Sequence, residues 1–182
     1  DPLYVEFRRL GYPQAWNLYS YTRNNPLKFV DPDGLEVKVN CGTTDEKKLQ
    51  TCNEQTTTDL NNRKDAQFKV EIKNGKLAIV GEVDVSKLSK SEKGLYTAIT
   101  DTKNVAELVV KMPGIGNENI MIGQYNGPGS NTVDRADLNQ LNKANPAISG
   151  EVIAHEIMEA YVGIAEGLNT YEKAHARANE FF

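Results

Sequence analysis

The stretch FKVEIKNGKLAIV (residues 68–80) decides the fold class of this chain. Its first five residues alternate apolar and polar side chains, which is the pattern of a strand with one buried face. Asn74-Gly75 comes next, a pair that readily adopts the positive φ angles of a tight hairpin turn. The next run, LAIVGEVDV (77–85), continues the strand pattern. The sequence therefore predicts a β-hairpin of two antiparallel strands at this place.

Further strands and a helix are expected on the C-terminal side of the hairpin. The run SEKGLYTAITD (91–101) predicts a short helix with Ser91 as its N-cap. The runs VAELVVKM (105–112) and NIMIGQY (119–125) are rich in apolar and β-branched residues and predict strands. The segment NGPGSNT (126–132) is typical of a flexible loop.

Three helices are expected after this loop. Asp134, Ser149 and Thr170 can each cap the start of one of them, because their side chains accept hydrogen bonds from free backbone N–H groups. The second helix is the longest helical pattern in the chain and is expected to stop at Gly167. The third is expected to run to Phe182. Together these patterns predict an α+β fold with a small, mainly antiparallel sheet and a C-terminal helix pair.

Composition and charge narrow the possible functions. The 182 residues are 39% hydrophobic and 25% charged, which is ordinary for a globular protein. No apolar run approaches the ~20 residues of a membrane span, so we expect no membrane segment. The net charge is −4, and lysine and arginine form no basic arm or face. A nucleic-acid partner is therefore not favoured.

The region before the hairpin is polar and carries both cysteines. Cys41 and Cys52 match no zinc-ribbon or CxxC spacing, so either they form a disulfide or they are two unrelated thiols. Residues 41–66 are mostly polar and suggest a loop or mobile linker. On this basis residues 36–66 are expected to link an N-terminal segment to a folded domain at 67–182.

The N-terminal segment contains NLYSYTRNNPLKFVDPDGL (17–35). This run closely resembles the end of the Rhs (YD-repeat) core of bacterial polymorphic toxins, in which an aromatic-Asn pattern, an NNP turn and DPxGL occur in this order. Residues 1–35 are accordingly expected to be the C-terminal segment of such a core, irregular or β in structure. In this family the core cuts itself after the Leu of DPxGL. The motif residues here are Asp31, Pro32, Gly34 and Leu35, and Asp31 matches a catalytic aspartate.

The resemblance also implies a role for the segment after the motif. In the Rhs family, the segment after DPxGL is a variable toxin that is secreted or translocated and acts in a target cell. The implied partners are the Rhs core shell of the full-length protein and a cognate immunity protein. Rhs proteins carry nucleases, deaminases, ADP-ribosyltransferases and peptidases alike as their variable toxins, which form the payload of the core. The chemistry of this payload therefore has to be inferred from its own residues.

The stretch VIAHEIMEAY (152–161) holds one of the two histidines of the chain. On a helix, His155 and Glu159 lie one turn apart on the same face, as do the two helix ligands of an HExxH zinc motif. Glu156 occupies the place of the general base in that motif. Here a carboxylate replaces the second histidine, and zinc accepts two histidines and one glutamate as a catalytic ligand set.

The second histidine, His175, is the expected third ligand. It falls on the less polar stripe of the last predicted helix, so it should point towards the preceding helix. The segment thus resembles a zincin-like metallopeptidase with HExxE in place of HExxH. This resemblance implies zinc as cofactor, ligands His155, Glu159 and His175, the general base Glu156 and a protein substrate. Tyr171, one turn before His175, could donate a hydrogen bond to an oxyanion.

Two other interpretations remain open from the sequence. The same cluster could serve a metal-dependent nuclease or another nucleic-acid-directed toxin, in which Mg²⁺ or Mn²⁺ would favour the carboxylates. Alternatively, the payload has no enzymatic activity and its histidines are structural. In that case His155 and Glu159 belong to the solvated face of an amphipathic helix.

Overall fold

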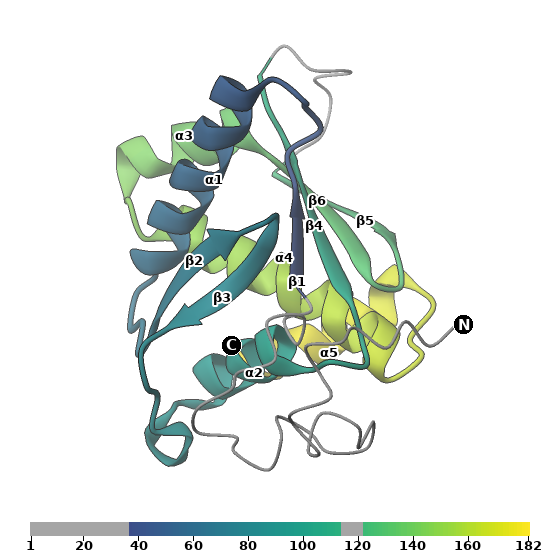
Figure 1. The fold of residues 1–182 in the computed structure, drawn as a ribbon. Helices are drawn as coiled ribbons and strands as arrows, with labels where there is room; N and C mark the ends of the chain where they lie inside the picture. Colours follow the sequence, from purple (N-terminus) through teal and green to yellow (C-terminus); the bar gives the residue numbers. More distant parts are fainter. Residues whose placement is uncertain (1–36, 114–121) are drawn as a thin grey trace, which may run out of the picture. The chain divides into compact units, whose positions relative to one another are not determined.

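A computed structural model describes residues 37–113 and 122–182, all of which belong to one compact unit. The unit is an α+β fold that ends in a helix pair, as predicted. Figure 1 shows its helices and strands. The described elements are β1 (Val37–Asn40), α1 (Glu46–Asn61), β2 (Lys69–Lys73), β3 (Lys76–Val80), the 3-10 helix η4 (Val85–Lys87), α2 (Lys90–Thr100), β4 (Ala106–Lys111), β5 (Gly123–Gly127), β6 (Ser130–Asp134), α3 (Arg135–Ala144), α4 (Ile148–Ala165) and α5 (Tyr171–Asn179).

The strands form one six-stranded sheet in the order β2-β3-β1-β4-β6-β5. The sheet is mixed rather than mainly antiparallel, because β1 pairs with β4 and β4 pairs with β6 in parallel. Parallel neighbours require long crossover connections, and the helices α1 and α2 lie between β1 and β4 in the chain. In β1 and β4 buried and more exposed residues alternate, so one face of the sheet carries the core.

The predicted hairpin is confirmed as β2 and β3. Asn74 and Gly75 take positive φ angles of 51° and 73°, and Lys73 pairs with Lys76 across the turn. The second strand is shorter than expected. It ends at Val80, because Gly81 adopts a φ of 78° and turns the chain away from the sheet.

The expected linker at residues 36–66 is wrong, because β1 and α1 are integral parts of the fold. Asp45 caps α1 by accepting hydrogen bonds from two backbone N–H groups, those of Lys47 and Lys48. The helix buries Cys52, Thr56, Asp59 and Leu60, a face that is half polar. A helix with such a face lacks the apolar stripe from which helices are recognised in a sequence. The folded domain therefore begins before residue 67.

The expected loop at residues 126–132 is also wrong. Its two ends belong to β5 and β6, which pair as an antiparallel hairpin at the edge of the sheet. Pro128 and Gly129 form the turn, and Gly129 takes a φ of 86°. The strand expected at 119–125 begins only at Gly123 within the described residues. This hairpin brings the middle of β6 against α4.

Helix α4 is the central helix of the domain. It contacts β4, β5 and β6 as well as all the other α-helices, and Figure 1 shows it running across the strands. It ends as predicted, with Gly167 at a φ of 67° just after the helix. Ser149 is not its N-cap, because this buried serine lies inside the first turn and donates to the carbonyl oxygen of Leu138.

The other helix ends agree with the predictions in part. Asp134 caps α3 through two backbone N–H groups, as expected. The cap of α2 is Ser89 rather than Ser91, since the Ser89 hydroxyl accepts from the N–H of Glu92. The last helix ends at Asn179 instead of continuing to Phe182, and the Thr170 side chain makes no capping hydrogen bond.

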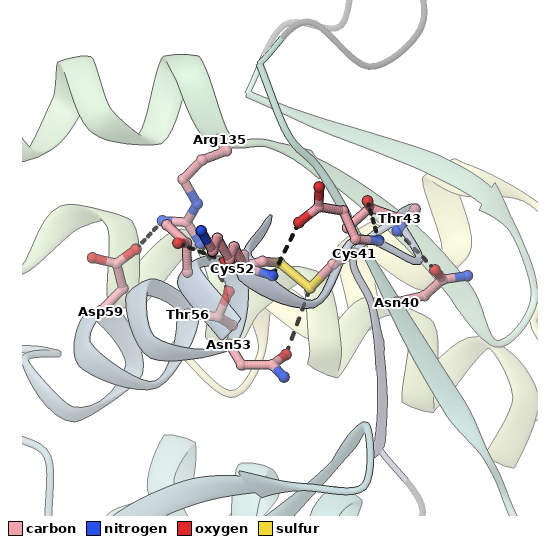
Figure 2. The surroundings of a disulfide bond; sticks show 12 residues. Asn40, Cys41, Thr43, Cys52, Asn53, Thr56, Asp59 and Arg135 are labelled. Atoms are coloured by element: carbon pink, nitrogen blue, oxygen red, sulfur yellow. Dashed lines mark hydrogen bonds and ion pairs between the residues drawn. A yellow bond between two sulfur atoms is a disulfide. The ribbon is translucent and has the colours of Figure 1, made fainter. Parts of the chain in front are cut away.

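Of the two alternatives for the cysteines, the structure has the disulfide. Cys41 and Cys52 are both buried, and their sulfur atoms lie 2.00 Å apart. Figure 2 shows how this bond fastens α1 to the end of β1. A cross-link that closes a loop of this length stabilises a fold by about 3 kcal/mol through the lost entropy of the unfolded chain.

Figure 2 also shows a buried polar cluster on the next turns of α1. Arg135 of α3 forms an ion pair with Asp59 and donates to the Thr56 hydroxyl at 2.9 Å. Asn142 donates to the other oxygen of Asp59 at 2.8 Å. This cluster joins α1 to α3. None of the helices in the described part of the chain is long and apolar enough to cross a bilayer.

Candidate metal centre

Two successive helices bring the two histidines together. His155 and Glu159 lie one turn apart on α4, and the short turn around Gly167 folds α5 back against it. His175 on α5 therefore faces α4, as its place on the less polar stripe predicts. The two imidazole rings lie with their centroids 4.9 Å apart. The candidate site is thus built by the C-terminal helix pair.

Three side-chain atoms converge at this point. His175 Nδ1 lies 2.7 Å from Glu159 Oε2 and 3.2 Å from His155 Nε2. The distance from His155 Nε2 to Glu159 Oε2 is 3.7 Å. Ligand atoms of a tetrahedral ion bound at about 2.0–2.1 Å lie about 3.3 Å from one another, and the three distances bracket this value. The group His155, Glu159 and His175 could therefore hold a metal ion.

The group has a buried side and an open side. The Glu159 side chain is 1% exposed and is the sole charged side chain among the buried residues of α4, whereas the His175 side chain is 38% exposed. Burial works to raise the pKa of the Glu159 carboxyl, but hydrogen bonds from the two imidazoles and from Asn131 outweigh it and lower the pKa. Glu159 is therefore an anionic group at the buried end of the cluster. It does not belong to a solvated helix face.

Glu156, the expected general base, lies beside the group without joining it. Its Oε2 accepts a hydrogen bond of 2.6 Å from the Asn131 amide, which also donates to Glu159 Oε1 at 2.9 Å. The backbone of Gly123 passes close to Glu156, since a Cβ atom there would lie 2.3 Å from Oε1. Burial raises the pKa of Glu156, and the Asn131 hydrogen bond offsets part of this rise.

Two tyrosines near the predicted site differ in position. The Tyr171 ring stacks on His175, with centroids 5.0 Å apart, so it lies at the open side of the group. Tyr161 points away and donates to Asp101 Oδ2 at 2.8 Å. Burial and this hydrogen bond raise the pKa of Tyr161 to about 12.

Sequence reasoning missed Asn131 and Gly123, which contact Glu156 from the β5–β6 hairpin. Asn131 lies in a segment that is expected to be a loop, whereas Gly123 lies in an expected strand but gives no sign of a contact with Glu156. The signal for β6 in the sequence is slight: in SNTVD (130–134) the two β-branched residues Thr132 and Val133 come directly before the helix cap Asp134. The self-cleavage residues Asp31, Pro32, Gly34 and Leu35 lie outside the described residues.

No protein family model, curated protein or solved structure matches this chain.

Proposed function

We propose that this domain is the C-terminal toxin of an Rhs-type polymorphic toxin and acts as a zinc-dependent peptidase in a competitor cell. The observation that carries the peptidase assignment is the convergence of His155, Glu159 and His175, with Glu156 next to the first histidine. The assignment to an Rhs-type toxin rests on the resemblance of residues 17–35 to the end of an Rhs core. Its implied partners are the core shell and an immunity protein.

The donor set favours zinc over a harder ion. Two imidazole nitrogens and one carboxylate oxygen are a known ligand set of catalytic zinc, whereas Mg²⁺ prefers oxygen ligands and keeps several waters. The described residues place no second carboxylate in the convergent group. A zinc ion held by these three residues would lower the pKa of a bound water to about 7 and polarise a carbonyl group.

The side chains around the group suit peptide hydrolysis. Glu156 accepts a proton from the attacking water and later delivers it to the leaving amine. A carboxylate whose pKa is raised by burial is better matched to such proton transfer near neutral pH. The Tyr171 hydroxyl is a candidate donor to the oxyanion that develops on the substrate carbonyl. The exposed side of His175 leaves the group accessible to substrate.

The assay that tests this function compares substrates and metals with the full chain. The zinc-loaded protein is incubated with unfolded protein and with the RNA and DNA of a target-cell lysate. We expect cleavage of protein, its loss after treatment with a chelator and its return with Zn²⁺. Degradation of nucleic acid that depends on Mg²⁺ would instead support a metal-dependent nuclease. No change in either substrate would favour a payload without hydrolytic activity.

A further inference from the structure

The middle of β6 places an amide group between two carboxylates. Asn131 is fully buried and pairs with Leu108 of β4 and Tyr125 of β5 in the sheet. Leu108 is itself buried on the face of the sheet that carries the core, so Asn131 faces the helix α4. Asparagine is depleted in strands and is an unfavourable choice for this position on packing grounds alone.

The hydrogen bonds of Asn131 are unevenly distributed. Its Nδ2 group donates to Glu156 Oε2 and to Glu159 Oε1, while its Oδ1 atom has no partner among the described residues. A buried acceptor without a partner destabilises a fold. The two N–H groups, in contrast, are both directed at the candidate site. This pattern indicates that the amide serves the two glutamates more than the stability of the sheet.

We propose that Asn131 is a positioning residue that fixes Glu156 and Glu159 with one amide group. This inference rests on the proposed zinc site. The amide occupies Oε1 of Glu159 and leaves Oε2, the atom that faces both histidines, as a single metal ligand. The same amide holds Oε2 of Glu156, while the backbone of Gly123 limits movement of Oε1.

The neutrality of the amide matters as much as its position. A lysine or arginine between the two carboxylates would neutralise the negative charge that attracts a cation. Asparagine supplies two donors without adding charge, so Glu159 keeps its attraction for the ion. Partners of metal ligands that orient them in this way typically change metal affinity by about 10–100-fold when they are removed.

The test measures zinc affinity and stability separately in Asn131→Leu, which has a similar size and no donor. Zinc affinity is determined with the full chain by competition with a chromogenic chelator, and stability by thermal unfolding of the metal-free protein. We expect zinc affinity to fall by about 10–100-fold. The metal-free protein should also lose some stability, because the buried carboxylate oxygens of Glu156 and Glu159 lose their donor, so the zinc affinities of folded wild type and folded variant decide the positioning role.

A second readout reports the coordination directly. With Co²⁺ in place of Zn²⁺, loss of the amide frees Glu159 to bind through both oxygens, and the visible absorption should weaken as the coordination number rises. The matched control is Thr132→Val. Thr132 is the next residue of β6, and its hydroxyl oxygen accepts a hydrogen bond of 2.7 Å from the Asn126 amide, away from the two glutamates. It should leave zinc affinity and the Co²⁺ spectrum unchanged.

The outcomes separate the two proposals. If wild type binds zinc and Asn131→Leu binds it equally well, the positioning role is refuted and the zinc site stands. If wild type binds no zinc, both proposals fail. A fall in stability of the metal-free protein without a change in zinc affinity would assign Asn131 a structural role instead. Where the leucine variant does not fold, Asn131→Ala gives the same comparison, because a smaller side chain cannot clash.

Discussion

Glu156→Gln is expected to keep the metal ion and to lose peptide hydrolysis. Glutamine has the shape of glutamate and can still accept the Asn131 hydrogen bond, so the surroundings of the group are preserved. It cannot take a proton from water, however. Loss of general acid–base catalysis typically slows a reaction by about 10²–10⁴-fold. The check is the turnover of an unfolded protein substrate, together with the zinc content of the same preparation.

The matched control is Glu151→Gln, the same change on the same helix. Glu151 lies five residues earlier, and the charged groups that influence it are Arg63, Glu92 and Asp65 rather than the two histidines. It should hydrolyse the substrate at the wild-type rate. Wild-type turnover in Glu156→Gln would contradict the assignment of the base, and loss of zinc in that variant would make Glu156 a ligand.

Asp59→Ala is expected to lower the free energy of unfolding by about 3–5 kcal/mol. Asp59 and Arg135 form an ion pair between α1 and α3 in which both side chains are buried. Removal of the carboxylate leaves the guanidinium buried without its counter-charge, and Asn142 loses its acceptor as well. The measurement is denaturant unfolding of wild type and variant, in oxidising buffer so that the disulfide stays closed.

Replacement of both partners tests the cause of this loss. An ion pair exchanged for apolar residues of similar size is often neutral or stabilising, so Asp59→Leu with Arg135→Met should recover most of the stability. A cost below about 1 kcal/mol for Asp59→Ala would mean that water reaches Arg135 and that the pair is not buried in solution.

The parts of the fold that the sequence predicts are those with local causes. The hairpin at β2 and β3 results from alternation and from Asn74-Gly75, and the end of α4 results from Gly167. Helix α1 escaped detection because its buried face contains Thr56 and Asp59. Their partner Arg135 lies more than 70 residues further along the chain, so the reason for burying these polar groups is not visible locally.

The same distinction applies to the site. His155 and Glu159 are readable as a pair from helical spacing, and His175 from its place on the inward stripe of α5. Asn131 is not, because its two carboxylate partners lie on α4, 25 and 28 residues later in the chain. Gly123 contacts Glu156 only through the arrangement of β5 over α4. Contacts between the sheet and the C-terminal helix pair could therefore be identified only from the structure.

The central claim is that His155, Glu159 and His175 hold one zinc ion. Elemental analysis of the purified full chain, beside His155→Ala and His175→Ala, tests it most directly. We predict about one zinc per chain in wild type and none in either variant, with circular dichroism showing that both variants remain folded. Folded wild-type protein without metal, after preparation without chelators and with zinc supplied, would contradict the claim and leave a hydrogen-bonded cluster of two histidines and a glutamate.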